Sequence, residues 1–266
     1  MAWTLCLCIG LCSGFLAGLL GVGGGTVIVP ALILGARLLG IGADDATPVA
    51  MATSLAIVIP TSISSARAHA ARGSIDWCAF RRLAPGIAAG ALAGTVAACT
   101  VGGRLPLAAF IGFALWATWG LLTRRADRTE ADRGAVLPGQ AALCRHSLAI
   151  GLLSSLAGVG GGLLSVPLLA HYLPMKRAIG TAAALGLPLA AAGLSGYLLA
   201  GHPVQCAAGC IGLVFLPAVL GVSLTAIAAA PLGASLAHHL PVRRLRQAFA
   251  GLLLLVSADL AAELLR

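Results

Sequence analysis

The chain has 266 residues, of which 59% are hydrophobic and only 9% are charged, and its mean hydropathy is +1.01. A soluble domain carries about 25% charged residues, and no compact soluble fold of this length could bury so much apolar surface. Composition therefore excludes a soluble protein and predicts a membrane protein. The net charge of +9 comes mainly from basic residues between apolar runs, a pattern that sets membrane topology and does not indicate nucleic-acid binding.

The first apolar run, at about residues 3–40, contains the pentapeptide GVGGG at 21–25. This run lacks the basic start of a secretory signal peptide. Since it also has a counterpart deep in the chain, we expect it to belong to the mature fold. The other runs of the first transmembrane repeat, predicted over residues 1–123, lie at about 47–66, 83–101 and 105–123.

Polar side chains are few in these runs. Thr53 and Ser54 lie early in the second run, where their hydroxyls could bond an anion or bond back to the carbonyl four residues earlier. His69 and Arg72 follow the end of that run. We interpret both as a basic flank at the membrane interface, with a proton-coupling or anion-attracting role as the alternative.

A polar segment, RRADRTEADRGAVLPGQ, begins at Arg124 and is charged and interrupted by Gly and Pro. It predicts a cytoplasmic linker over residues 124–145. The second repeat, predicted over residues 146–266, then follows. Its apolar runs lie at about 147–173, 178–200, 204–230 and 243–264.

The second half repeats the first. An offset of 137 residues places Gly14–Ile33 over Gly151–Ala170, and GVGGG over a second GVGGG at 158–162. Further along the chain, Thr53 matches Thr181. Agreement of this kind indicates an internal duplication. Most of the runs in both halves exceed the roughly 20 residues that a helix needs to cross a bilayer, so we expect an all-α polytopic membrane protein.

Basic residues concentrate in four segments: 67–82, the linker, 176–177 and 243–246. The positive-inside rule places all four on the cytoplasmic side, and Asp44 and Asp45 outside. The loop after the first glycine element then faces outward, while the equivalent loop after the second faces inward. We therefore predict two inverted repeats, each with one glycine-interrupted helix element and three transmembrane helices.

The arms that flank the second GVGGG have only about 13 residues, or roughly 20 Å of helix. A hydrocarbon core is about 30 Å thick, so these arms predict a re-entrant hairpin with the pentapeptide at its tip. The arms of the first element are longer, about 20 and 15 residues. They fit either two full crossings or a broken, re-entrant element.

Irregular backbone inside a membrane leaves peptide groups that lipid cannot hydrogen-bond. Glycine adopts positive φ without steric cost, so consecutive glycines can form a nest of N–H groups at the positive end of the next helix, which is an anion site. Paired broken segments in two inverted halves are typical of the binding site of a secondary transporter. The predicted substrate-binding residues are Gly23, Gly24, Gly25, Gly160, Gly161, Gly162, Thr53, Ser54 and Thr181.

These motifs also allow other interpretations. The glycines could instead permit close helix packing. A phosphate-binding or dinucleotide loop is excluded because neither copy follows a strand or has the required partners. Cys206 and Cys210 lie four residues apart on a predicted helix and could form a metal or redox pair, but we favour small packing residues. No cofactor, metal or enzymatic residue set is expected.

At these residues the chain resembles the sulfite exporter TauE/SafE family, also called the toluene sulfonate uptake permeases, over essentially its whole length. The matching features are both GVGGG segments with the following Pro30 or Pro167, ATSL at 52–55, and HAARGSIDW at 69–77. Where the family often has a Thr-Ser pair in the second half, this chain has Thr181 and Ala182.

The resemblance implies a multi-pass protein of the bacterial inner membrane that transports small anions such as sulfite, sulfonates or related organosulfur acids. The bilayer and the anion are its expected partners, nucleic acid is not, and a homo-oligomer is left open. The alternatives are an anion channel and a membrane assembly or scaffold subunit that does not transport.

Overall fold

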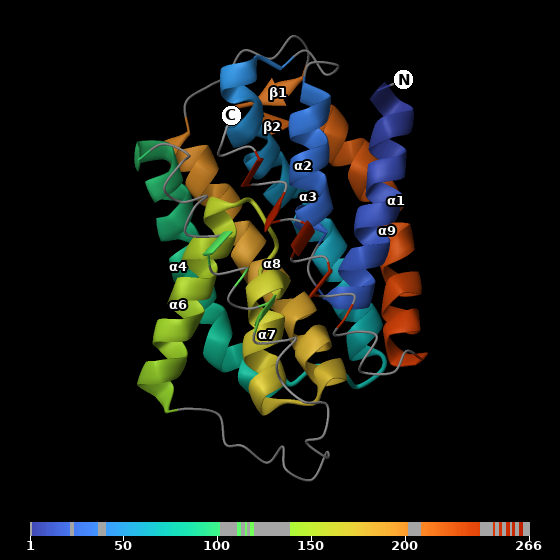
Figure 1. Ribbon diagram of the computed structural model, residues 1–266, viewed down its shortest axis with the longest axis vertical. Coiled ribbons are helices and arrows are strands. Elements are labelled where there is room, and N and C mark those ends of the chain that lie inside the picture. The colour runs from blue at the N-terminus through green and yellow to red at the C-terminus, as the bar shows by residue number, and fades with distance from the viewer. Residues whose placement is uncertain are drawn as a thin grey trace.

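In a computed structural model of the chain, residues 2–21, 24–36, 41–101, 139–201 and 209–239 are described, together with isolated helical residues within 111–119 and 247–262. The elements in chain order are α1 (Ala2–Leu20), α2 (Gly25–Gly35), α3 (Ala43–Ala70), α4 (Trp77–Val101), α6 (Gln140–Leu156), α7 (Gly162–Tyr172), α8 (Met175–Ala200), β1 (Cys210–Ile211), β2 (Val214–Phe215) and α9 (Leu216–His239). Figure 1 shows a helical bundle with α3 and α8 at its centre.

The helices have the length and composition of membrane spans. Within the described ranges, four stretches are long and apolar enough to cross a bilayer: Asp45–Ala70, Trp77–Thr100, Met175–Ala200 and Leu216–Ala237. Cys6–Leu20 in α1 is a shorter apolar helix. The prediction of an all-α polytopic membrane protein is therefore confirmed.

Two helix pairs meet along stripes of small residues. In α1, a Cβ added at Gly10, Gly14 or Gly18 would collide with the backbone or side chains of α9. A second stripe on α4 does the same against α6, and it consists of Gly86, Gly90 and Gly94. Glycine at four-residue spacing lets helix backbones approach closely. These two close helix contacts depend on glycines that lie outside the two pentapeptides.

The order of these contacts fixes helix direction. Gly10, Gly14 and Gly18 meet progressively later residues of α9, so α1 and α9 run in parallel. Along α8 the contacts with α3 run in reverse, since Gly186 meets Ser62 and Gly193 meets Leu55. His69 near the end of α3 meets Gly18 near the end of α1, and Asp76, just before α4, meets Thr181 near the start of α8. The glycines of α4 also meet progressively later residues of α6, so α1, α3 and α9 point one way, and α4, α6 and α8 point the other way. Corresponding helices of the two halves are opposed, as Figure 1 shows.

Two short strands precede α9. Cys210 pairs with Phe215 and Ile211 with Val214 in an antiparallel hairpin, and Gly209 and Gly212 have positive φ, 88° and 59°. The sequence-based expectation of one helix through 204–230 is therefore wrong, because these glycines turn the chain before the helix begins. Cys210 lies in a strand and is disulfide-bonded, so it is not on a helix face as expected. Cys206 lies outside the described residues.

Candidate functional site

Both GVGGG segments interrupt a helix. In the first, α1 ends at Leu20, and Gly21 and Gly24 adopt φ of 68° and 80° before α2 begins at Gly25. In the second, α6 ends at Leu156 and Gly158 adopts φ of 63°. These left-handed conformations favour glycine. Of the predicted site residues, Gly23 lies outside the described residues.

The two interruptions meet each other. A Cβ added at Gly25 would lie 3.0 Å from the backbone nitrogen of Gly160, from Cα of Val159 and from Oγ of Ser54. Residues from three distant parts of the sequence therefore share one buried point. We call Gly25, Val159, Gly160 and Ser54 the tip junction. From it, α2 and α7 extend toward opposite ends of the bundle (Figure 1).

Glycine occupies the N-cap position of both helices at the tip junction. Gly24, before α2, and Gly161, before α7, have no side chain that could cap the first-turn N–H groups. First-turn N–H groups have no intrahelical acceptor, and each helix N-terminus carries about half a positive charge. Gly162 opens α7 and is buried. Two positive helix ends therefore converge where the predicted site residues lie.

Hydroxyl groups without partners gather on the same elements. Ser54 and Thr26 are buried, and neither side-chain oxygen has a hydrogen-bond partner within the described part of the chain. The same holds for Ser154 in α6 and Ser165 in α7. A buried unsatisfied polar group costs about 1–3 kcal/mol. Sequence analysis missed Thr26, Ser154 and Ser165, and proximity to GVGGG was the signal that could have found them.

Thr53 precedes Ser54 in α3, whereas Thr181 lies near the start of α8, and both have structural partners. The N–H of Phe215 donates to Oγ1 of Thr53 at 2.9 Å, and the N–H of Asp76 donates to Oγ1 of Thr181 at 2.9 Å. Phe215 immediately precedes α9, and Asp76 immediately precedes α4. Each central helix thus holds the start of a helix from the other half of the chain.

The two helix interruptions likewise pack against the central helix of the other half of the chain. Gly21 sits against the backbone carbonyl of Ile179 in α8, and Gly158 sits against Met51 in α3. Ile179 lies two residues before Thr181, and Met51 lies two residues before Thr53. The first interruption therefore packs on the central helix of the second half, and the second packs on that of the first.

Comparison with known proteins agrees with this architecture. The model of the sulfite exporter TauE/SafE family matches residues 6–260. A probable membrane transporter protein of Haemophilus influenzae is 33% identical over 260 residues, which cover 96% of this chain and 97% of that protein. This chain belongs to the TauE/SafE family.

Two further relatives of the TauE/SafE protein are also named probable membrane transporter proteins. The one from Methanocaldococcus jannaschii is 28% identical and covers 91% of this chain and 89% of its own length. The one from Bacillus subtilis is 25% identical and covers 76% and 80%. No solved structure matches this chain. The protein is therefore a multi-pass membrane protein of a transporter family.

The HAARGSIDW segment of this TauE/SafE protein places its polar residues differently from the expected interfacial flank. His69 is only 1% exposed, and its Nε2–H donates to the carbonyl oxygen of Gly18 at 2.9 Å. Ser65 donates to the carbonyl of Ala17 at 3.3 Å. These carbonyls belong to the last turn of α1, where that of Ala17 also accepts the N–H of Gly21 at 2.9 Å. The side chains of α3 therefore fix the end of α1 just before the first GVGGG. Arg72, by contrast, is exposed as expected.

Proposed function

We propose that this TauE/SafE protein is a secondary transporter that binds small anions at the tip junction, with sulfite, sulfonates and related organosulfur acids as its substrate class. The observation that carries the proposal is the convergence of two helix N-termini, each with glycine at its N-cap, on one buried point beside Ser54. Backbone N–H groups at helix starts recognise anions, and the unpartnered hydroxyls of Thr26 and Ser54 would add donors. The predicted glycines are the backbone part of this site.

We further propose that the two halves are inverted repeats and that α2 and α7 are re-entrant. The opposed directions of corresponding helices support the first point. For the second, α2 and α7 have 11 residues each, or about 16 Å, which is too short to cross a core of about 30 Å. Alternating access by rocking of two halves around a shared central site fits this arrangement.

The orientation we propose places the end of the bundle with Arg67, Arg81 and Lys176 in the cytoplasm of a bacterial cell, following the positive-inside rule. The disulfide at Cys210 lies at the end where α3 begins, because Phe215 beside it contacts Thr53. Disulfides persist in oxidising compartments, which supports an outward-facing position for that end. A protein that retains Cys78 as its sole free thiol should react with an impermeant maleimide in inside-out vesicles alone.

The test of the proposed function compares two buried serines. Ser54→Ala removes an unpartnered hydroxyl at the tip junction, whereas Ser155→Ala removes a buried hydroxyl that donates to the carbonyl of Leu152 at 3.1 Å. A hydrogen bond to a charged group is worth about 1.5–3 kcal/mol, so Ser54→Ala should weaken anion binding roughly tenfold to a hundredfold. Ser155→Ala should leave it near wild type. Uptake of labelled sulfite and sulfonates into proteoliposomes measures both.

The same assay separates the alternatives. Saturable flux supports a carrier, whereas flux that rises linearly with anion concentration would indicate a channel. A scaffold subunit would show neither flux nor thermal stabilisation by any anion in detergent, and that result would overturn the proposal. Gly25→Ala is a second probe, because its Cβ would enter the 3.0 Å contacts with Gly160 and Ser54. Gly24 is a poorer choice since its φ of 80° makes any side chain costly.

A further inference from the structure

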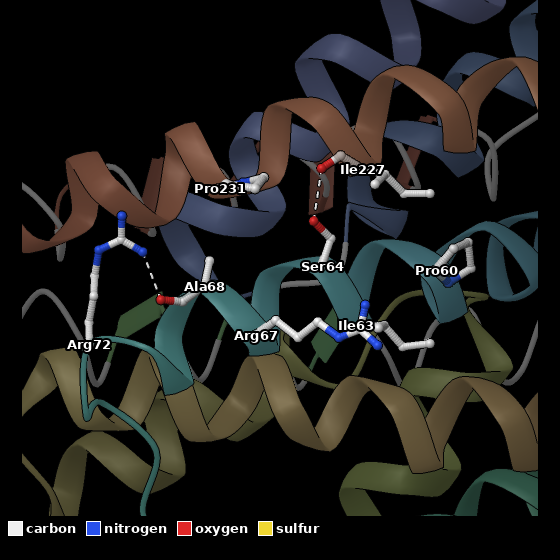
Figure 2. Close-up of a pocket in the computed structure, with 8 residues that line it drawn as sticks. All are labelled: Pro60, Ile63, Ser64, Arg67, Ala68, Arg72, Ile227 and Pro231. Atoms are coloured by element: carbon white, nitrogen blue, oxygen red, sulfur yellow. Dashed lines mark hydrogen bonds between the residues drawn. The ribbon is translucent and has the colours of Figure 1, made fainter.

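A groove separates the lower part of α3 from α9, apart from the tip junction. Its cavity volume is about 490 Å³, within the roughly 300–1,000 Å³ of small-molecule sites. Six lining residues come from α3 and its end and two from α9, and they are Pro60, Ile63, Ser64, Arg67, Ala68, Arg72, Ile227 and Pro231. Figure 2 shows this groove between the two helices.

One hydrogen bond joins α3 and α9 across the groove. Pro231 has no N–H, so the carbonyl of Ile227, four residues earlier, lacks its helical donor. Oγ of Ser64 donates to that carbonyl at 2.8 Å. A freed carbonyl at membrane depth needs such a partner. Pro231 and its compensating bond from Ser64 therefore define the contact between α3 and α9 at the groove.

The groove has a charged end and an apolar wall. Arg67 and Arg72 are exposed, no carboxylate lines the groove, and neither guanidinium forms an ion pair within the described ranges. One guanidinium N–H of Arg72 donates to the carbonyl of Ala68 at 2.7 Å. Arg67 extends back along α3 toward Ile63 (Figure 2). Most guanidinium donors thus stay open for an anionic group.

The apolar wall lies within membrane-spanning helices. Pro60 and Ile63 belong to the span Asp45–Ala70, and Ile227 and Pro231 to the span Leu216–Ala237. Beside the groove, α9 exposes large apolar side chains, namely Leu220 at 65%, Leu224 at 70% and Leu232 at 66%. Such a face is stable against acyl chains. The groove therefore joins a lipid-facing surface to two cations near the end of α3.

We propose that this groove binds an anionic phospholipid. Its phosphate would pair with Arg67 or Arg72, and one acyl chain would lie along Pro60, Ile63, Ile227 and Pro231. Basic pockets between transmembrane helices bind anionic headgroups in this way. A free inorganic anion would use only the arginines and gain nothing from the wall, which favours an amphiphile. The proposal concerns a site separate from the tip junction and does not depend on the transported substrate.

The test titrates purified, delipidated protein with phosphatidylglycerol, phosphatidylcholine or inorganic phosphate, and follows bound lipid by native mass spectrometry and stability by thermal shift. We expect tight binding of phosphatidylglycerol alone. Arg67→Gln and Arg72→Gln should each weaken it about fivefold. The controls Arg81→Gln and Arg82→Gln change exposed basic residues at the start of α4, outside the groove, and should bind lipid as wild type does.

Other outcomes would overturn the proposal. Equal binding of phosphatidylcholine would remove the role of charge, and stabilisation by inorganic phosphate that the Arg67 and Arg72 variants abolish would indicate a free-anion site. Equal loss in the Arg81 and Arg82 variants would indicate diffuse attraction to the membrane surface. Should a glutamine variant fold poorly, Arg67→Lys retains the charge and Ala68→Leu fills the groove. The first should keep most of the lipid binding, and the second should reduce it.

Discussion

The pairs Thr53–Ser54 in α3 and Thr181–Ala182 in α8 occupy equivalent positions in the sequences of the two halves, yet only the first pair carries a second hydroxyl. Both threonines accept a backbone N–H from the start of a helix in the other half, at 2.9 Å. Only the first half follows its threonine with a hydroxyl, that of Ser54, at the tip junction. Each half therefore uses a threonine to hold a helix start, while only the first half places a hydroxyl next to that threonine at the candidate site.

The largest expected effect comes from breaking the close approach of Gly158 to Met51. A Cβ at Gly158 would lie 2.6 Å from Cα of Met51, whereas Gly73, with nearly the same φ, has nothing within 4 Å. Left-handed backbone alone costs about 1–2 kcal/mol, and overpacking adds about 1–3 kcal/mol. Gly158→Ala should thus lower thermal stability well below Gly73→Ala. Equal stabilities in detergent would show that the approach to α3 is loose.

A middle-sized effect tests the equivalence of the two threonines. Thr53→Val and Thr181→Val each leave a buried N–H without an acceptor, at a cost of about 1–3 kcal/mol. Thr95→Val is the matched control, because that hydroxyl donates only to carbonyls of its own helix, Ala91 and Leu92. Denaturation in detergent should show similar losses for the first two and a smaller one for the control. Unequal losses would contradict the view that these residues have one shared role.

The smallest effect concerns the missing hydroxyl. Ala182→Ser places a hydroxyl at the sequence position equivalent to Ser54. Since its alignment with the anion is not built into the site, it should return only part of the about 1.5–3 kcal/mol that Ser54→Ala removes. In a Ser54→Ala background it should restore anion affinity about twofold to tenfold, as measured by thermal shift with sulfite. If anion affinity fails to recover while the double variant remains folded, the two positions do not face the same site.

The sequence predicted the parts of this protein that repeat or that depend on one residue type. Paired GVGGG segments and their glycine backbone were expected at one site, and Gly25 and Gly160 do meet. Partners far apart in the chain could not be foreseen. Phe215 and Thr53 are 162 residues apart, and Gly18 and His69 are 51 residues apart. Only the folded chain reveals that Thr53 is structural and that His69 is buried.

Two element boundaries predicted from apolar and polar composition differ from those in the structure. The run at 204–230 is apolar enough for a helix, but positive φ at Gly209 and Gly212 makes a hairpin before α9. Conversely, α6 begins at Gln140, inside the predicted linker, because Ala and Leu at 141–143 favour helix despite the polar residues around them. The apolar or polar composition of a segment therefore did not locate the ends of its helix, which depend on individual backbone conformations and on helix propensity.

The exchange of helices between halves has a consequence for the order of synthesis. The first helix made, α1, packs along the last described one, α9, and the bond from Thr225 to the carbonyl of Leu7 joins residues 218 positions apart. Likewise the N–H of Asp76 meets Thr181 only after a further 105 residues. During translation the glycine stripe of α1 must therefore wait in the membrane facing lipid or the insertion machinery. Neither half can complete its helix contacts alone, so both halves reach their final packing only after α9 has been synthesised.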